Sequence, residues 1–453
     1  SPSSAQPIAA VAAVQGSARL RTADRYAVPR VPQPIDLRLQ ANEGPEPPRE
    51  LTEWLPRQPM KFVNQYPNPA PLEKELARHI GVDPARVVAT AGADDALDRI
   101  CQAFLDESRR AVMARPTFEM IPRYVHKATG GEPACRVEVP WIDPAAGFPI
   151  DAFLRAINGR TGAVFVVTPN NPTGLEARPE HLEAIAERLA AVGGGGVLVA
   201  DLAYDEFADA SLMPVCLRLM ERFGNVAVTR TMSKAWGLAG LRVGYAVATE
   251  EIASALRTIG HPYGVSHASL ALAERWLREG REAMERGVER VCAERAELAG
   301  LLVRLGADAL PSGANFVLAS FGRGPHGLAR AAWVRDALAS LGIAVRLFER
   351  PAEIAGHVRI SCPCSEASFA RLSEALRRAL RPNALAETPG EKGDWVLVRT
   401  REEAEKARFE RRVSLGIGGP DLLGAGAARI VADAAEARAL LASLAPQPEE
   451  TPA

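Results

Sequence analysis

Short apolar runs alternate with helix-patterned segments between residues 65 and 260, and this alternation restricts the possible folds more than any other feature. The runs are continuous, as in strands buried on both faces of a sheet, and the segments between them have helical spacing of apolar residues. The sequence therefore predicts an α/β fold with a mainly parallel mixed sheet covered by helices. The runs lie at 87–90, 111–113, 163–167, 197–200 and 226–229, and helical segments lie at 72–80, 94–104 and 181–192.

A second, smaller α+β domain is predicted from the pattern after residue 280. Residues 280–382 hold long charged helical segments at 282–304, 326–341 and 366–380, with strand patterns at 315–320 and 357–361 between them. Residues 35–60 contain several prolines, which predicts extended structure and turns.

These patterns divide the chain into a large domain, a small domain and two terminal pieces. The large, ligand-binding domain is predicted at 65–274, and the small domain at 35–64 and 275–382. A mobile N-terminal arm is predicted at 1–34, a linker at 383–393 and a short α/β appendage at 394–453.

Charge and cysteine content restrict the kind of partner. The 453 residues include 54 Lys and Arg against 55 Asp and Glu, which argues against nucleic-acid binding and against a polybasic membrane anchor. No apolar run is long enough for a transmembrane helix. Six cysteines at mostly long, irregular spacings indicate a reducing compartment, so a cytoplasmic location is predicted. The Cys362-Pro363-Cys364 pair lacks the second half of a zinc set, so no metal site is predicted.

Polar residues follow each predicted strand, and ligands bind outside the carboxyl ends of the strands in such sheets. Any one of these segments is weak evidence, because a lone lysine is usually a surface residue and Asn-Pro-Thr-Gly forms turns in many contexts. The segments are Gly-Ala-Asp-Asp at 92–95, Thr-Pro-Asn-Asn-Pro-Thr-Gly at 168–174, Asp-Leu-Ala-Tyr at 201–204, Thr-Met-Ser-Lys at 231–234 and Gly-Leu-Arg-Val-Gly at 240–244.

Taken together and in this order, these segments resemble the fold-type I enzymes that depend on pyridoxal 5′-phosphate (PLP). Within the class I and II aminotransferases, the closest likeness is to histidinol-phosphate aminotransferases. The likeness covers residues 35–382 and is sharpest at 66–69, 168–174 and 231–244. It implies a PLP-binding large domain and a homodimer.

The resemblance also assigns roles around the PLP ring. Lys234 is implied to form the resting Schiff base with the cofactor aldehyde and then to move the proton during catalysis. Asp201 is implied to keep the pyridine nitrogen protonated. The phenolic oxygen is implied to accept hydrogen bonds from Asn171 and Tyr204.

Further residues are implied for the phosphate, the ring faces and the substrate. The phosphate is implied to bind the helix start at Ala93 and Asp94 together with Ser233 and Arg242. The substrate α-carboxylate is implied to bind Arg359. The remaining implied contacts are Phe118 and Ala203 on the ring faces and Tyr66 reaching into the site of the partner subunit. Asn42 and Arg346 are predicted as further substrate-binding residues, with Arg346 as an extra anchor for a substrate anion.

Three functions fit these residues. The first is an aminotransferase acting on an L-amino acid or amino-alcohol phosphate, with histidinol phosphate as the leading donor and 2-oxoglutarate as acceptor. The second is a PLP-dependent decarboxylase or lyase, and the third is a non-catalytic PLP-binding sensor. Leu202 stands where the family often has glutamate, which leaves the subfamily open.

The end of the chain has its own likeness. Residues 425–441 resemble the closing piece of haloacid-dehalogenase-type phosphatases, with strands predicted at 412–416 and 429–433 and helices at 422–427 and 434–444. The Asp-x-Asp nucleophile motif of that family is missing from residues 394–453. A remnant or docking appendage without phosphatase activity is therefore predicted.

Overall fold

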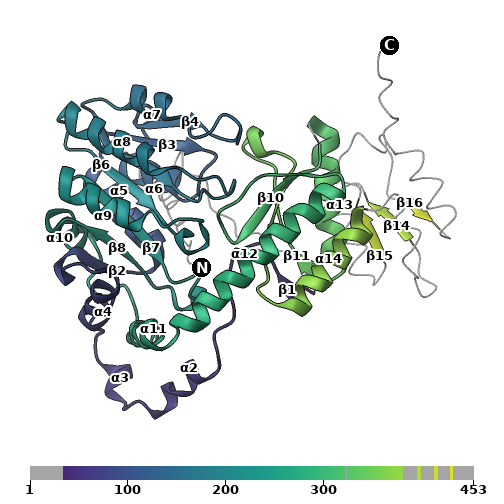
Figure 1. Ribbon diagram of the computed structural model, residues 1–453, viewed down its shortest axis with the longest axis horizontal. Helices are drawn as coiled ribbons and strands as arrows, with labels where there is room; N and C mark the ends of the chain where they lie inside the picture. The colour runs from purple at the N-terminus through teal and green to yellow at the C-terminus, as the bar shows by residue number, and fades with distance from the viewer. Residues whose placement is uncertain (1–33, 323, 381–394, 399–412, 417–428, 432–453) are drawn as a thin grey trace, which may run out of the picture.

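The computed structural model describes residues 34–322, 324–380, 395–398, 413–416 and 429–431. Two lobes stand side by side in Figure 1, and the long helix α12 (Arg281–Arg304) runs between them. The predicted N-terminal arm and linker lie almost wholly outside the described residues. The domain boundaries given above therefore stay predictions.

The larger lobe is built on a seven-stranded sheet in the order β2–β8–β7–β6–β5–β3–β4. All neighbours in this sheet are parallel except β8, which runs antiparallel to both β2 and β7. The predicted α/β fold with a mainly parallel mixed sheet is thus confirmed. The strands are β2 (Val87–Thr90), β3 (Arg110–Arg115), β4 (Arg136–Pro140), β5 (Thr161–Val167), β6 (Val197–Asp201), β7 (Val226–Thr231) and β8 (Gly244–Ala248).

Helices cover both faces of this sheet, which explains why its strands are apolar throughout. In β5, Val164 packs into the core on one face, whereas Ala163 and Phe165 pack into the core on the other. One face is covered by α5 (Gly92–Phe104), α6 (Ile121–Ala128) and α10 (Glu250–Ile259). The other is covered by α4 (Ala70–Ile80), α7 (Ile150–Ala156), α8 (Pro179–Val192), α9 (Met213–Phe223) and α11 (His267–Glu279).

The smaller lobe contains a four-stranded antiparallel sheet, in the order β12–β13–β10–β9. Its strands are β9 (Asp308–Ala309), β10 (Phe316–Ser320), β12 (Arg346–Phe348) and β13 (His357–Ser361), and its helices are α12, α13 (Gly324–Ser340) and α14 (Glu366–Leu380). Near the N-terminus, β1 (Leu37–Arg38) pairs in parallel with β11 (Ile343–Ala344) beside this sheet.

Residues 50–64 differ from the prediction of extended structure and turns. They form α2 (Glu50–Glu53), a 3-10 helix (Leu55–Arg57) and α3 (Lys61–Asn64), each of three or four residues. Trp54 packs edge-on against Phe62, whose ring lies 4.3 Å from that of His267 at the start of α11. Packing against α11 thus stabilises turns of helix that are too short to give a periodic sequence pattern.

The C-terminal appendage contains a three-stranded sheet in the order β15–β14–β16. The strands predicted near 412–416 and 429–433 are confirmed as β15 (Val413–Gly416) and β16 (Arg429–Val431). The central strand β14 (Trp395–Val398) was not predicted, and the helices predicted at 422–427 and 434–444 lie outside the described residues. Within the described parts of the chain, no helix is both long and apolar enough to cross a membrane.

Candidate active site

Three parallel strands of the large sheet end side by side and carry the candidate residues to one edge. Val167 at the end of β5 pairs with Asp201 at the end of β6, and Asp201 pairs with Thr229 on β7. Because parallel strands point the same way, the segments that follow them leave the sheet at the same edge. Asn171, Tyr204 and Lys234 all lie in these segments.

Lys234 lies three residues beyond β7, with a half-buried side chain. Its Nζ donates a hydrogen bond to the carbonyl oxygen of Ala41 at 3.2 Å and lies 5.8 Å from the centroid of the Tyr204 ring. Burial and, to a smaller extent, the positive charges of Arg359 and Arg242 together lower the pKa of Lys234 to about 8. A neutral amine, which can act as a nucleophile or a base, is therefore accessible near neutral pH.

Asp201 is a buried carboxylate at the end of β6. Thr229 donates a hydrogen bond from its hydroxyl to Oδ1 of Asp201 at 3.0 Å. Burial nevertheless raises the pKa of Asp201 to about 7, with a smaller contribution from the negative charge of Asp94. A cation placed against this carboxylate would restore its ionised form, so the site suits a protonated ring nitrogen.

Tyr204 is also buried, and burial raises the pKa of its phenol. Its hydroxyl oxygen accepts a hydrogen bond from Nδ2 of Asn42 at 3.0 Å. Its ring packs edge-on against Phe316 of the small domain, with centroids 5.4 Å apart. The phenol therefore lies where the N-terminal segment and both sheets meet.

An anion-binding cup is formed where α5 starts. The residue before this helix, Ala91, has no capping side chain, and its own backbone N–H donates to Oδ2 of Asp95 at 2.9 Å. The N–H groups of the first helical residues therefore have no cap from the N-cap residue and suit an anion. Arg242 donates to the hydroxyl of Ser233 at 3.3 Å and to the carboxylate of Asp94 at 3.1 Å. A Cβ added to Gly244 would lie 2.5 Å from the backbone nitrogen of Ala93, so only glycine permits this close approach.

Two arginines of the small domain face this edge. Arg359 on β13 is buried and donates to Oδ1 of Asn171 at 2.5 Å and to the carbonyl oxygen of Gln40 at 2.8 Å. Arg346 on β12 is its partner in the strand register, and it forms an ion pair with Glu119 of the large domain at 3.5 Å. Both guanidinium groups lie over the ring of Phe348, at 5.5 and 5.7 Å from its centroid.

The remaining predicted residues lie in different environments. Phe118 is partly buried and packs against the core beneath α5 and α6, and Ala203 packs against the core on the opposite face of the sheet. Direct contacts join Tyr204 to Lys234 and to Asn42, and join Arg359 to Asn171. The ring of Phe316 lies against both Tyr204 and Arg359 and so connects the two groups. Tyr66 instead is 78% exposed and stacks on Tyr263.

Sequence reasoning missed several groups at this edge. Thr229 supports Asp201, and its only sequence signal is a polar residue ending an apolar run. Glu119 and Ser361 contact Arg346 and Asn42, and neither belongs to a segment that the strand-end pattern singled out. The carbonyl groups of Gln40 and Ala41 are backbone acceptors, for which side-chain chemistry gives no signal.

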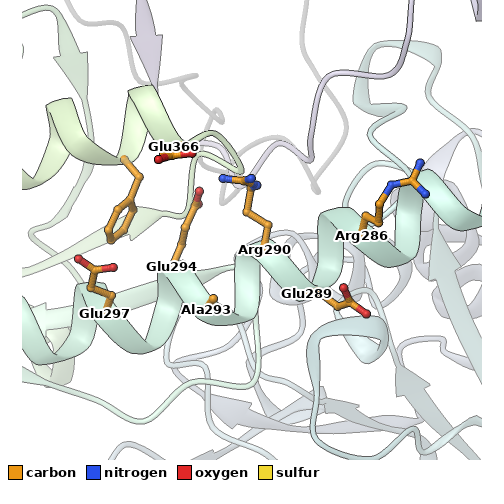
Figure 2. A pocket seen from close by; sticks show the side chains of 8 residues that line it. Arg286, Glu289, Arg290, Ala293, Glu294, Glu297 and Glu366 are labelled. Carbon is orange, nitrogen blue, oxygen red and sulfur yellow. The ribbon is translucent and has the colours of Figure 1, made fainter.

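A depression of about 520 Å³ elsewhere does not belong to this edge. It lies between α12 and α14 and is lined by charged side chains of both signs, with Phe369 beside them (Figure 2). Glu294 on its floor accepts a hydrogen bond from the backbone N–H of Cys364 at 2.7 Å. This contact satisfies a backbone donor just before α14, which is a structural role.

Comparison with known proteins places this geometry in a family. Residues 36–376 match the family model "Aminotransferase class I and II". The chain is 32% identical over 342 residues to histidinol-phosphate aminotransferase of Thermoanaerobacter pseudethanolicus, covering 74% of this chain and 91% of that protein. It is 35% identical over 353 residues to aromatic amino acid aminotransferase of Streptomyces coelicolor, covering 77% and 92%.

A solved structure agrees with these sequence relationships. Histidinol-phosphate aminotransferase from Sinorhizobium meliloti, in complex with pyridoxal-5′-phosphate, superposes with a TM-score of 0.67 at 28% identity, covering 77% of this chain and 91% of that one. The predicted resemblance is thereby confirmed, as are the fold type and the cofactor. The chain belongs to the class I and II aminotransferases and is a PLP-dependent aminotransferase.

Proposed function

We propose that this aminotransferase takes the amino group of histidinol phosphate and passes it to 2-oxoglutarate. The observation that carries this proposal is the register pairing of Arg346 with Arg359, which puts two cations on one face of the small-domain sheet. A phosphate-bearing donor and a dicarboxylate acceptor both need such cations, and the two substrates of a transaminase use one site in turn. The curated histidinol-phosphate aminotransferases among the relatives support the same donor.

When bound, PLP supplies an aldehyde that condenses with amines and a ring that withdraws electrons from the substrate. The donor set at the sheet edge fits this group. We assign Lys234 to its aldehyde, Asp201 to its ring nitrogen, and Asn171 and Tyr204 to its phenolic oxygen. Its phosphate is assigned to Ala93, Asp94, Ser233 and Arg242, and its ring faces to Phe118 and Ala203.

Different residues of the chain are assigned to different parts of the amino transfer. The amine of Lys234, with its lowered pKa, would take the proton from the carbon that bears the amino group of the donor and deliver it to the carbon on the other side of that nitrogen. Arg359 holds the carboxylate of the acceptor, and its contact with Asn171 ties that carboxylate to the cofactor side of the site. The buried carboxylate of Asp201 maintains positive charge on the ring nitrogen.

An aromatic amino acid is the second candidate donor. The guanidinium of Arg359 lies over the rings of Phe316 and Phe348, at 5.3 and 5.7 Å from their centroids, so a carboxylate held there would have apolar surface nearby. Glu119 already pairs with Arg346, which weakens the attraction of that arginine for a distant phosphate. The aromatic amino acid aminotransferases among the relatives favour this donor too.

The test is single-turnover conversion of the PLP-loaded protein by separate donors, followed by visible absorbance. Histidinol phosphate is expected to convert the cofactor to its amine form faster than histidinol or phenylalanine, and 2-oxoglutarate is expected to reverse the change. A faster reaction with phenylalanine would assign the aromatic donor. Release of carbon dioxide from an amino-acid donor, without conversion of the cofactor, would support a decarboxylase.

The role of Lys234 is tested by Lys234→Ala. The variant is expected to bind PLP without the visible band of the covalent linkage and to lose at least about 1,000-fold in the rate of amino transfer. Arg346→Gln is the matched comparison, because it removes a cation from the same site but leaves the amine in place. A Lys234→Ala protein with a normal visible band would refute the assignment.

We also propose a homodimer in which Tyr66 of each subunit reaches the site of the other. The exposure of its aromatic ring supports this proposal together with that of Met60 and Val63, which are each 75% exposed, since exposed apolar side chains that gather in one patch mark an interaction surface. A cytoplasmic location is part of the same proposal, supported by six cysteines that are all free in the structure.

A further inference from the structure

Asn42 occupies an unusual backbone position next to the candidate site. Its side chain is 1% exposed, and its φ of 53° lies in the left-handed region, which asparagine tolerates better than other side-chain-bearing residues. It precedes the segment that passes the Lys234 loop, and the backbone of Ala41 accepts the hydrogen bond from Lys234. A residue so constrained and so buried must satisfy all of its polar groups inside the protein.

The hydrogen bonds around Asn42 determine which atom of its side-chain amide accepts and which donates. The Asn42 backbone N–H donates to Oγ of Ser361 at 3.1 Å, so the hydroxyl proton of Ser361 is free to point elsewhere. It points to Oδ1 of Asn42, 2.9 Å away. Because Oδ1 is thereby fixed on the Ser361 side, Nδ2 is fixed on the other side, where it donates to the Tyr204 hydroxyl oxygen at 3.0 Å.

These hydrogen bonds determine the direction in which the hydroxyl proton of Tyr204 points. Its oxygen accepts a hydrogen bond from Asn42, which leaves the hydroxyl proton available for an acceptor on the other side of the phenol. A phenol that accepts one hydrogen bond also becomes a stronger donor, since neighbouring hydrogen bonds polarise one another. Asn315 stabilises the position of Asn42, because its side-chain amide donates a hydrogen bond to the carbonyl oxygen of Asn42 at 3.3 Å.

We propose that Asn42 is a positioning residue that directs the Tyr204 proton toward the phenolic oxygen of PLP. This inference rests on the proposed placement of the cofactor at Lys234 and Tyr204. Ser361 lies on β13, two residues after Arg359, so the same chain of hydrogen bonds connects the strand that holds the substrate carboxylate with the electronics of the cofactor. Asn42 thus acts through Tyr204 and does not need to touch the substrate.

The inference predicts a spectroscopic change with a definite sign. A donor on the phenolic oxygen stabilises its negative charge and makes the neighbouring nitrogen of the lysine linkage a weaker base. Losing that donor raises the pH at which the linkage loses its proton. Asn42→Gly keeps the left-handed backbone but removes the amide, whereas Asn42→Ala would add backbone strain and confuse the result.

The experiment is a pH titration of the visible absorbance of the PLP-loaded proteins. Asn42→Gly is expected to raise the midpoint by about half to one pH unit, which corresponds to one hydrogen bond of ordinary strength. Tyr204→Phe is expected to raise it at least as much. In the Tyr204→Phe background, Asn42→Gly is expected to add almost nothing, because its effect passes through the phenol.

Ser361→Ala provides a second variant in case Asn42→Gly does not fold. It leaves Asn42 in place but frees its amide to turn over, so a smaller rise of the midpoint is expected. An unchanged midpoint in the single variants, or an equal shift with and without the Tyr204 hydroxyl, would overturn the inference. Absence of a visible band in the unaltered protein would instead contradict the proposed cofactor placement.

Discussion

The acidity of Lys234 is set mainly by burial and by two arginines that have different tasks. Arg359 belongs to the small domain and is assigned to the substrate, whereas Arg242 belongs to the phosphate cup. Both cations disfavour the protonated amine, and so does burial. The groups assigned to the two anions of the reaction therefore also lower the pKa of the amine assigned to its chemistry.

This arrangement predicts how PLP loading depends on pH. Only the neutral amine attacks the cofactor aldehyde, so the rate of covalent loading of the cofactor-free protein should rise with pH around a midpoint of about 8. Arg359→Gln removes a neighbouring positive charge, which should move the midpoint upward by about half a unit. Stopped-flow absorbance after mixing with PLP measures both midpoints.

Arg346→Gln serves as the control for this measurement, because Arg346 is already paired with Glu119 and is not among the charges that dominate at Lys234. Its midpoint should match that of the unaltered protein. A midpoint near 10.5, the ordinary value for lysine, would show that burial and the arginines do not act on this amine in solution.

At the scale of elements, glycines allow the N-terminal segment around Gly44 and the loop that contains Lys234 to pack closely against each other. A Cβ added to Gly44 would lie 1.7 Å from the carbonyl oxygen of Lys234, and one added to Gly237 would lie 2.1 Å from the carbonyl oxygen of Pro45. Two backbone segments nearly 200 residues apart in sequence are thus in direct contact. Side chains at either glycine would push the loop away from the sheet edge.

Gly44→Ala is therefore expected to destabilise the protein by about 1–3 kcal/mol and to weaken PLP retention, since overpacking here displaces backbone rather than a flexible side chain. Thermal unfolding and the rate of PLP loss in the presence of a trapping amine report the two effects. Gly240→Ala is the matched control, because no described atom lies within 4 Å of its added Cβ. If the two variants had the same unfolding temperature and the same rate of PLP loss, the close contact at Gly44 would be contradicted.

The elements also show what the sequence could and could not predict. Strands β5, β6 and β7 were predicted because burial on both faces requires continuous apolar runs, and their polar ends gave most of the site. The antiparallel β8 was missed, because its five residues directly follow the arginine turn and have no turn-flanked pattern of their own. Asn42 was predicted to bind substrate, but its contacts with Tyr204 and Ser361 depend on a tertiary approach across 162 and 319 residues of sequence.

On the scale of the whole molecule, ion pairs cross between the two lobes beside the site. Arg346 pairs with Glu119, and Arg115 at the end of β3 pairs with Glu353 of the small domain. These contacts are partly exposed, so each contributes at most about 1 kcal/mol. They are weak enough to exchange partners, so a substrate anion that takes Arg346 would release Glu119 as it binds.

The surface around α3 bears the most exposed of the large apolar side chains of the described residues. Met60 and Val63 are each 75% exposed, and Tyr66 stacks on Tyr263 next to them. If a second copy covers this surface, Val63→Asp would place a charge in a desolvated interface and should weaken dimerisation at least about tenfold. Sedimentation equilibrium measures the change. Val303→Asp is the control, because Val303 is 58% exposed on the distant end of α12.

An active site built from residues of two subunits allows a more specific test than dimerisation alone. Tyr66→Ala should damage the site of the partner subunit, whereas Lys234→Ala should damage the site of its own chain. Mixing the two variants would produce hybrids with one intact site, built from Lys234 of one chain and Tyr66 of the other. Amino-transfer activity should therefore return to about a quarter of that of the unaltered protein after random re-association, because half of the dimers are hybrids with one working site each. Hybrids that form but stay inactive would show that Tyr66 serves its own subunit, whereas a fully active Tyr66→Ala protein would show that Tyr66 serves neither site.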